Sequence, residues 1–201
     1  MNRLASALFI SGIVTVSIYS IIFASKIEAE EIVTDADDNI EVVVDVNIET
    51  EEFDCTNISP KQYDYTNISK NLPTRNNNPG NIRKTEVTYY GETTNSSGFE
   101  SFAAPEWGYA AMFDLLDRLY TGLTLEEAIY KWAPPVENDS ARYVRFVARE
   151  TGLNAQQFLI DVNDQRIINV AKYMSILEGM KGFSNLDITM GYVIWNYCYN
   201  K

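Results

Sequence analysis

The first stretch whose side chains could bind a ligand is a run of amides and guanidiniums near the middle of the chain. Residues 75–83 read RNNNPGNIR, four amides and a Pro-Gly pair between two arginines. Pro-Gly and Asn favour tight turns, so an ordinary surface turn is one interpretation. The run is longer than a turn needs, and Arg75, Asn76, Asn78 and Asn81 are suited to hydrogen-bonding a hydroxyl-rich ligand such as a sugar. We therefore consider them candidate substrate-binding residues.

Glu178 is the candidate acid. It follows an apolar helical pattern over 164–178 and precedes Gly179. Burial and the negative end of a helix both disfavour a carboxylate, so both would raise the pKa of Glu178 towards the range of a general acid. Many glutamates at helix ends are merely exposed, and Glu86 and Glu100 are rival carboxylates near the amide run.

The second unusual stretch is WAPPVEN, residues 132–138. Trp132 beside a Pro-Pro bend gives a rigid aromatic plane that could stack on a sugar ring, or it could plug the junction between two helices. Glu137 could bond the backbone at the start of the next helix, which Asn138 or Asp139 would cap.

Composition narrows the chemistry. The 201 residues include no histidine, which excludes Ser-His-Asp and Cys-His nucleophile systems and makes a catalytic zinc site improbable. No Gly-rich phosphate loop is present. We expect no cofactor and no metal, and proton transfer by carboxylates with help from Tyr or Lys.

The net charge of −12 is concentrated in one segment. Residues 26–54 contain 12 acids and one base, whereas residues 55–201 contain 16 acids and 14 bases. A body without excess positive charge argues against nucleic-acid binding. The acidic segment reads as a solvated, extended stalk in which residues 42–48 could form one short strand.

The N-terminus predicts export. Residues 4–24 form an uncharged run of 21 residues after Arg3, which is either a cleaved signal peptide or a membrane anchor oriented N-in, C-out. Cys55 and Cys198 lie beyond it and either pair, which an oxidising compartment favours, or remain free thiols. The expected division is 1–25 signal or anchor, 26–73 stalk and 74–201 globular domain.

The elements that would position these residues are mostly helical. Residues 85–104 predict a β-hairpin with a loop. Helices are expected from Pro105 to Gly122, from the capping box at Thr124 to Pro134, and from Asn138 or Asp139 to Gly152. A further helix would begin at Asn154 and another run over 164–178, and residues 188–199 are ambiguous between helix and strand. The fold class is α+β, mainly α.

Several motifs occur together in one order: RNNNPGNI (75–82), GFESF (98–102), PEWG (105–108), WAPPVEN (132–138) with Tyr143, and Glu178-Gly179. Over residues 74–182 this set resembles phage and prophage virion-associated proteins, often called structural proteins, with a lysozyme-like murein-degrading domain. Family members tend to read Glu-x-Gly where this chain has Glu178-Gly179, and the pair is similar to the catalytic glutamate setting of phage lysozymes. Because this glutamate comes late in the chain, the resemblance implies a rearranged lysozyme-like topology.

The resemblance implies an exported muramidase or lytic transglycosylase acting on peptidoglycan glycan strands. Glu178 would be the general acid, and the amide run, Trp132, Glu137 and Asn138 would bind substrate. If no second carboxylate takes part, the acetamido group of the substrate would replace it and an anhydro product would form; Glu137 or Glu100 would otherwise serve. The alternative is a non-catalytic wall-binding or virion surface protein with the same fold.

Overall fold

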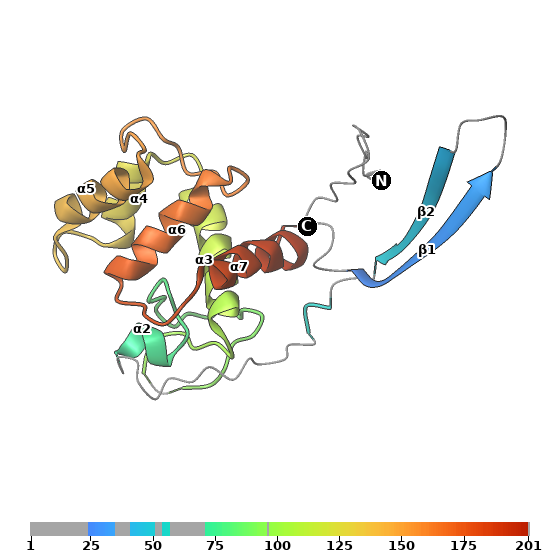
Figure 1. The fold of residues 1–201 in the computed structure, drawn as a ribbon. Helices are drawn as coiled ribbons and strands as arrows, with labels where there is room; N and C mark the ends of the chain where they lie inside the picture. Colours follow the sequence, from blue (N-terminus) through green and yellow to red (C-terminus); the bar gives the residue numbers. More distant parts are fainter. Residues whose placement is uncertain (1–23, 35–40, 51–53, 57–70, 96, 201) are drawn as a thin grey trace. The chain divides into compact units, whose positions relative to one another are not determined.

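The computed structural model describes residues 24–34, 41–50, 54–56, 71–95 and 97–200 (Figure 1). The chain divides into two compact units, Met1–Phe53 and Asp54–Lys201. The hydrophobic run 4–24 lies outside the described residues except for its last position. Among the helices that are described, none is long and apolar enough to cross a membrane.

In the first unit, β1 (Ala24–Thr34) pairs antiparallel with β2 (Glu41–Thr50). Glu28 lies opposite Asn47 and Val33 opposite Val42, and the register is irregular between Ala24 and Ile27. This two-stranded ribbon corrects the expectation of an unpaired stalk. The Val- and Ile-rich stretches of β1 and β2 have the high β-propensity that strands favour, and this outweighs the acid density.

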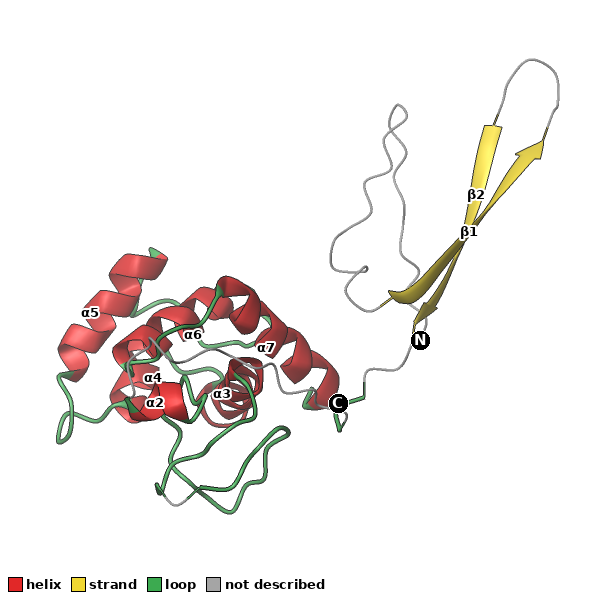
Figure 2. Ribbon diagram, turned by 60° about the horizontal axis from the view of Figure 1, so that its bottom comes forward, coloured by secondary structure: helices red, strands yellow, loops and turns green. Residues whose placement is uncertain are grey.

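The second unit is helical, and this confirms a mainly α protein. Its elements are α2 (Leu72–Arg75), α3 (Pro105–Tyr120), α4 (Leu125–Trp132), α5 (Ser140–Thr151), α6 (Arg166–Leu177) and α7 (Asn185–Cys198). α3 and α7 form the most extensive helix pair, and α6 contacts both α5 and α7. Figure 2 shows the long loop region that follows α2 in green beside this helical cluster.

Most of the helix signals in the sequence are realised. Thr124 and Glu127 form the capping box of α4, Asp139 rather than Asn138 caps α5, and Gly152 ends α5 in left-handed conformation. The tail is helix α7, which opens with a second capping box formed by Ser184 and Asp187.

Two expected elements are replaced by loops. No strand forms within the described part of 85–104, where isolated antiparallel bridges join Arg83 to Phe99 and Glu92 to Phe102. No helix begins at Asn154. Backbone bonds from Leu125 N to Phe158 O and from Ile160 N to Leu123 O (both 2.8 Å) instead fasten that segment beside the start of α4.

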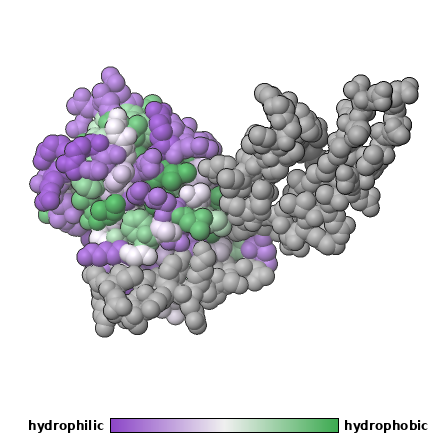
Figure 3. Space-filling model, in the orientation of Figure 1, coloured by the Kyte–Doolittle hydropathy of each residue, from purple (hydrophilic) through white to green (hydrophobic). Residues whose placement is uncertain are grey.

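The core is centred on α3. Tyr109, Met112, Phe113 and Leu116 of α3 are completely buried, and the Tyr109 hydroxyl bonds Ser175 Oγ of α6 at 2.8 Å. Outside this core, the face seen in Figure 3 is mainly hydrophilic, with smaller hydrophobic areas between. The buried side chains of α3 and the bond between Tyr109 and Ser175 thus hold α3 and α6 in place, and these two helices border the candidate site.

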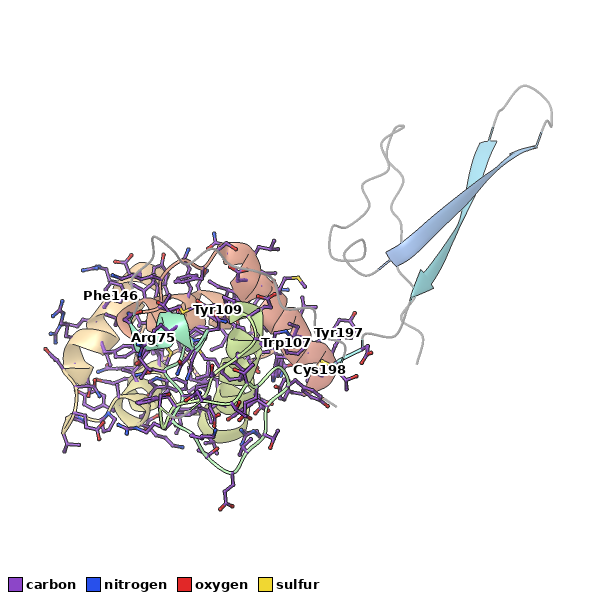
Figure 4. The ribbon with its side chains drawn as sticks, turned by 90° about the horizontal axis from the view of Figure 1, so that it is seen from below. Arg75, Trp107, Tyr109, Phe146, Tyr197 and Cys198 are labelled. Atoms are coloured by element: carbon purple, nitrogen blue, oxygen red, sulfur yellow. A yellow bond between two sulfur atoms is a disulfide. The ribbon has the colours of Figure 1, made fainter. Side chains whose placement is uncertain are left out.

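The two cysteines are paired. Cys55 and Cys198 form a disulfide across 143 residues, which confirms the favoured reading (Figure 4). Cys198 is the last residue of α7, so the bond fastens the segment before α2 to the helix that packs against α3. An oxidising, exported environment suits such a bond.

Gly108 provides a test of how the amide run is held against α3. A Cβ at Gly108 would overlap the carbonyl oxygen of Asn77 and lie 2.6 Å from Cδ of Pro79. We predict that Gly108→Ala lowers the free energy of unfolding by about 2 kcal/mol, because overpacking outweighs the gain in helix propensity. Denaturant unfolding measures this change, and a stabilised variant would contradict the close approach.

Candidate functional site

The amide run is a cross-linked loop. Asn77 and Asn81 adopt left-handed backbone (φ 49° and 47°), which asparagine tolerates. Asn78 is fully buried. Its Nδ2 donates to Ile82 O (2.9 Å) and Glu100 O (3.0 Å), and its Oδ1 accepts from Ile82 N (2.8 Å). Asn76 Nδ2 likewise donates to Glu100 O at 3.2 Å.

Only part of the predicted binding set therefore faces a cavity. Asn76 and Asn78 are buried and hold the backbone, and Arg75 is exposed at the end of α2 (Figure 4). None of these three side chains lines the cavity described below, whereas Asn81 does. The amides of Asn76 and Asn78 act on the protein's own carbonyl groups, and their contribution to a ligand site is to shape the loop.

A cavity of about 430 Å³ lies where this loop meets α3 and the α4–α5 connection. It brings together the predicted residues Asn81, Trp132, Glu137, Asn138 and Glu178. The remaining lining residues, contributed by the loop and by α3 and α4, are Gly80, Ile82, Arg83, Thr85, Val87, Tyr89, Phe99, Leu115, Arg118, Leu119, Tyr120 and Ala133. A cavity wall that combines polar groups, a tryptophan and exposed apolar side chains is suited to binding a carbohydrate.

Glu178 is half-buried in this wall, at the C-terminal cap of α6. Its Oε1 accepts two hydrogen bonds of 3.1 Å, from Trp132 Nε1 and from the Tyr143 hydroxyl, and the Asn81 amide supplies a further one. Burial raises the pKa of Glu178 above its ordinary value, and the bonds from Tyr143, Trp132 and Asn81 oppose that rise in part. The net effect is that the neutral form of this carboxyl is favoured more than in an exposed glutamate.

The turn after Glu178 is held by α2. Gly179 has φ of 93°, a left-handed conformation that glycine adopts without strain. Asn71 Nδ2 donates to Gly179 O, and Lys181 N donates to the buried Thr74 Oγ1 at 3.0 Å. Because α2 leads directly into the amide run, the loop that carries Asn81 and the turn that follows Glu178 share one anchor.

Trp132 combines two roles. Its ring lies 5.5 Å from that of Tyr120, and a Cβ on Gly80 would come within 2.9 Å of its Cζ2. The indole therefore fills the junction between α3, α4 and the loop, as one interpretation predicted. It also lines the cavity and donates to Glu178, so this junction orients the acid.

A second cavity of about 310 Å³ shares Glu178 and Asn138 with the first. Its other lining residues are Asp139, Arg142, Tyr143 and Leu177. A chain-like ligand that passes from one cavity to the other would cross Glu178 and Asn138.

The rival carboxylates lie elsewhere. Glu100 is 1% exposed, and its Oε1 accepts from Thr85 N at 3.0 Å. Burial raises its pKa, but Glu100 does not line the cavity, and neither does the exposed Glu86. Of the described residues that line the cavity, the acids are Glu137 and Glu178.

The sequence patterns contain Tyr143 and Arg83, but neither of them, nor Arg118, was assigned a role in the site. Tyr143 is 35 residues from Glu178, and no local pattern relates them. For Arg118 the sequence did contain a signal, because Asp114 lies one helical turn earlier and such a pair can interact. In the structure the two side chains are 2.7 Å apart, and Nη2 of Arg118 donates to the Tyr89 hydroxyl at 3.3 Å.

The fold and site define a mainly helical, disulfide-bonded protein with a half-buried carboxyl group of raised pKa in the wall of a polar and aromatic cavity. No known family model matches the chain. It is 36% identical over 104 residues to Protein P5 of Pseudoalteromonas phage PM2, a match covering 47% of this chain and 64% of P5. The chain thus matches less than two thirds of the length of this phage protein.

The hydrogen bonds to Glu178 give a prediction about its pKa. The donors Tyr143, Trp132 and Asn81 all favour the carboxylate, so removing one should raise the pKa of Glu178 further. We expect Tyr143→Phe to raise it, because the variant loses a hydrogen bond that stabilises the charged form. A carbon-13 NMR titration of the side-chain carboxyl measures it, with the exposed Tyr130→Phe as control. An unchanged or lower pKa would contradict the proposed hydrogen bonding.

Glu178 also gives a prediction about stability. Its folded-state pKa is raised, so between the unfolded and folded values the native state binds more protons and stability falls as pH rises. Gln cannot ionise, and we therefore expect Glu178→Gln to raise the Tm relative to the unsubstituted protein at pH 7 and less at pH 4. Calorimetry at both pH values tests this, and a Tm difference that does not grow with pH would exclude a costly buried carboxylate.

Proposed function

We propose that this protein is an exported, peptidoglycan-degrading glycosidase, a muramidase or lytic transglycosylase with a lysozyme-like active site. The observation that carries the proposal is Glu178: a half-buried carboxyl of raised pKa, held by Trp132 and Tyr143 in the wall of the cavity. The similarity to a phage protein is shared by this proposal and by the non-catalytic alternative below, and it does not favour catalysis. Residues 1–25 would direct export as a signal peptide or anchor the chain in the membrane.

In the proposed reaction, neutral Glu178 donates its proton to the glycosidic oxygen between N-acetylmuramic acid and N-acetylglucosamine as the C1–O bond breaks. Trp132 and Tyr143 both donate to Oε1, so they stabilise the carboxylate that forms. The acetamido oxygen of the substrate attacks C1 from the opposite face, which removes the need for a second carboxylate. Glu178 then accepts a proton from the group that opens this intermediate, either water or the substrate's own C6 hydroxyl.

The position of Glu137 favours the substrate-assisted route. Its Oε2 is 2.9 Å from Arg83 Nη2 and its side chain is 58% exposed, so in the unliganded protein this carboxylate is paired and solvated rather than free to attack C1. Attack by water gives a reducing end, whereas attack by the C6 hydroxyl gives a 1,6-anhydro end. Mass spectrometry of the soluble products distinguishes them.

The test substitution is Glu178→Gln in the full chain with its disulfide formed. We expect release of disaccharide-peptides from purified peptidoglycan to fall about 10²–10⁴-fold, the usual contribution of general acid catalysis. Glu150→Gln on the exposed face of α5 is the matched control, with unchanged activity. Retained activity in a folded Glu178→Gln protein would remove Glu178 from the mechanism.

The second candidate is a wall-binding or virion surface protein without catalysis. It is favoured by the scarcity of acids in the cavity: of the described lining residues only Glu137 and Glu178 are acids, and Glu137 is paired with Arg83 when no ligand is bound. Sedimentation with insoluble peptidoglycan without release of sugar ends would establish this function in place of the first.

A further inference from the structure

An ion pair connects two walls of the cavity of about 430 Å³ that Glu178 lines. Arg83 is the last residue of the amide run, Glu137 lies between α4 and α5, and Arg83 Nη2 is 2.9 Å from Glu137 Oε2. Both residues line the cavity, and their side chains are 70% and 58% exposed. Such an exposed pair contributes little to stability, so its carboxylate can be exchanged for another at small cost.

The guanidinium has a second support that does not depend on Glu137. Its Cζ lies 5.5 Å from the ring centroid of Phe99, which also lines the cavity, and the backbones of Arg83 and Phe99 form an antiparallel bridge. An arginine placed over an aromatic ring keeps its planar donor fork available for a carboxylate. Arg83 would therefore remain in position when Glu137 leaves.

The other charges at the cavity do not offer the same exchange. Arg118 donates through Nε to the largely buried Asp114 and through Nη2 to Tyr89. Glu178 is biased towards its neutral form by burial. Arg83 is thus the cavity-lining cation whose partner is itself an exposed side chain of the wall.

We propose that Arg83 is a specificity-determining residue that binds a carboxylate of the ligand in place of Glu137, so that the cavity selects acidic glycan strands over neutral ones. The inference rests on the proposed function, because peptidoglycan strands carry such groups and chitin strands do not. The group that Arg83 would bind is a carboxylate close to the sugar ring. It belongs either to a lactyl ether or to the peptide attached to that ether.

The test measures binding by calorimetry with the full-length Glu178→Gln variant, so that no strand is cleaved. The ligands are chitotetraose, a tetrasaccharide of alternating N-acetylglucosamine and N-acetylmuramic acid with free lactyl acids, and the same tetrasaccharide carrying dipeptides. We expect an acidic strand to bind about ten-fold more tightly than chitotetraose, the order of one charge-assisted contact. Preference for the free lactyl or the dipeptide form identifies the source of the carboxylate.

Substitutions at Arg83 and Glu137 test whether this ion pair is the source of the preference for acidic strands. In the same background, Arg83→Gln should remove most of the ten-fold preference while leaving chitotetraose binding within about two-fold. Glu137→Gln should strengthen acidic binding, because it removes the competing carboxylate. The matched control is Arg149→Gln, an exposed arginine of α5 paired with Glu150, which should change neither affinity.

Three results would overturn the proposal: equal binding of acidic and neutral strands, an equal loss of both in Arg83→Gln, or no binding of any strand. The outcome is separable from catalysis. A protein that cleaves peptidoglycan but shows no acidic preference contradicts this inference alone. A protein that prefers acidic strands through Arg83 but releases no sugar ends contradicts the glycosidase proposal alone.

Discussion

Partial burial of a single carboxyl group is the constraint on which the rest of the site depends. Desolvation makes the charged form of Glu178 costly, and only donors brought from elsewhere can moderate that cost. Trp132 ends α4, Tyr143 lies in the first turns of α5, and Asn81 belongs to the loop before α3. Three separate segments must therefore meet at the end of α6 before this carboxyl acquires its properties.

The loop and the acid are also joined through the backbone. α2 lies between them, because Asn71 and Thr74 bond the turn at Gly179 and Lys181, and the next residues are the amide run. Gly108 allows α3 to approach that run closely. These contacts give the cavity walls a common support, which is the preorganisation that an active site requires.

The asparagines of the amide run have two different roles: some hold the loop together, and one faces the cavity. Asn76 and Asn78 satisfy buried carbonyl groups, and Asn81 faces the cavity, although all three side chains carry the same donors and acceptors. At its far end, Arg83 and Glu137 place opposite charges across the cavity wall. The loop thus provides its own scaffold, one amide for the acid, and a cation at the rim.

The sequence by itself determined features that depend on near neighbours: helix caps at Thr124, Asp139 and Gly152, the acid at a helix end, and a chemistry restricted by the lack of histidine. The tertiary structure decided features that depend on distant partners. Residues 85–104 pair only through isolated bridges, and Asn76, Asn77 and Asn78 bond the carbonyl groups of Glu100 and Phe102 in that segment. The segment after Asn154 is held by bonds to Leu123 and Leu125. Which amides face a ligand, and which donors reach Glu178, follow from contacts between residues far apart in the chain, and no local pattern encodes them.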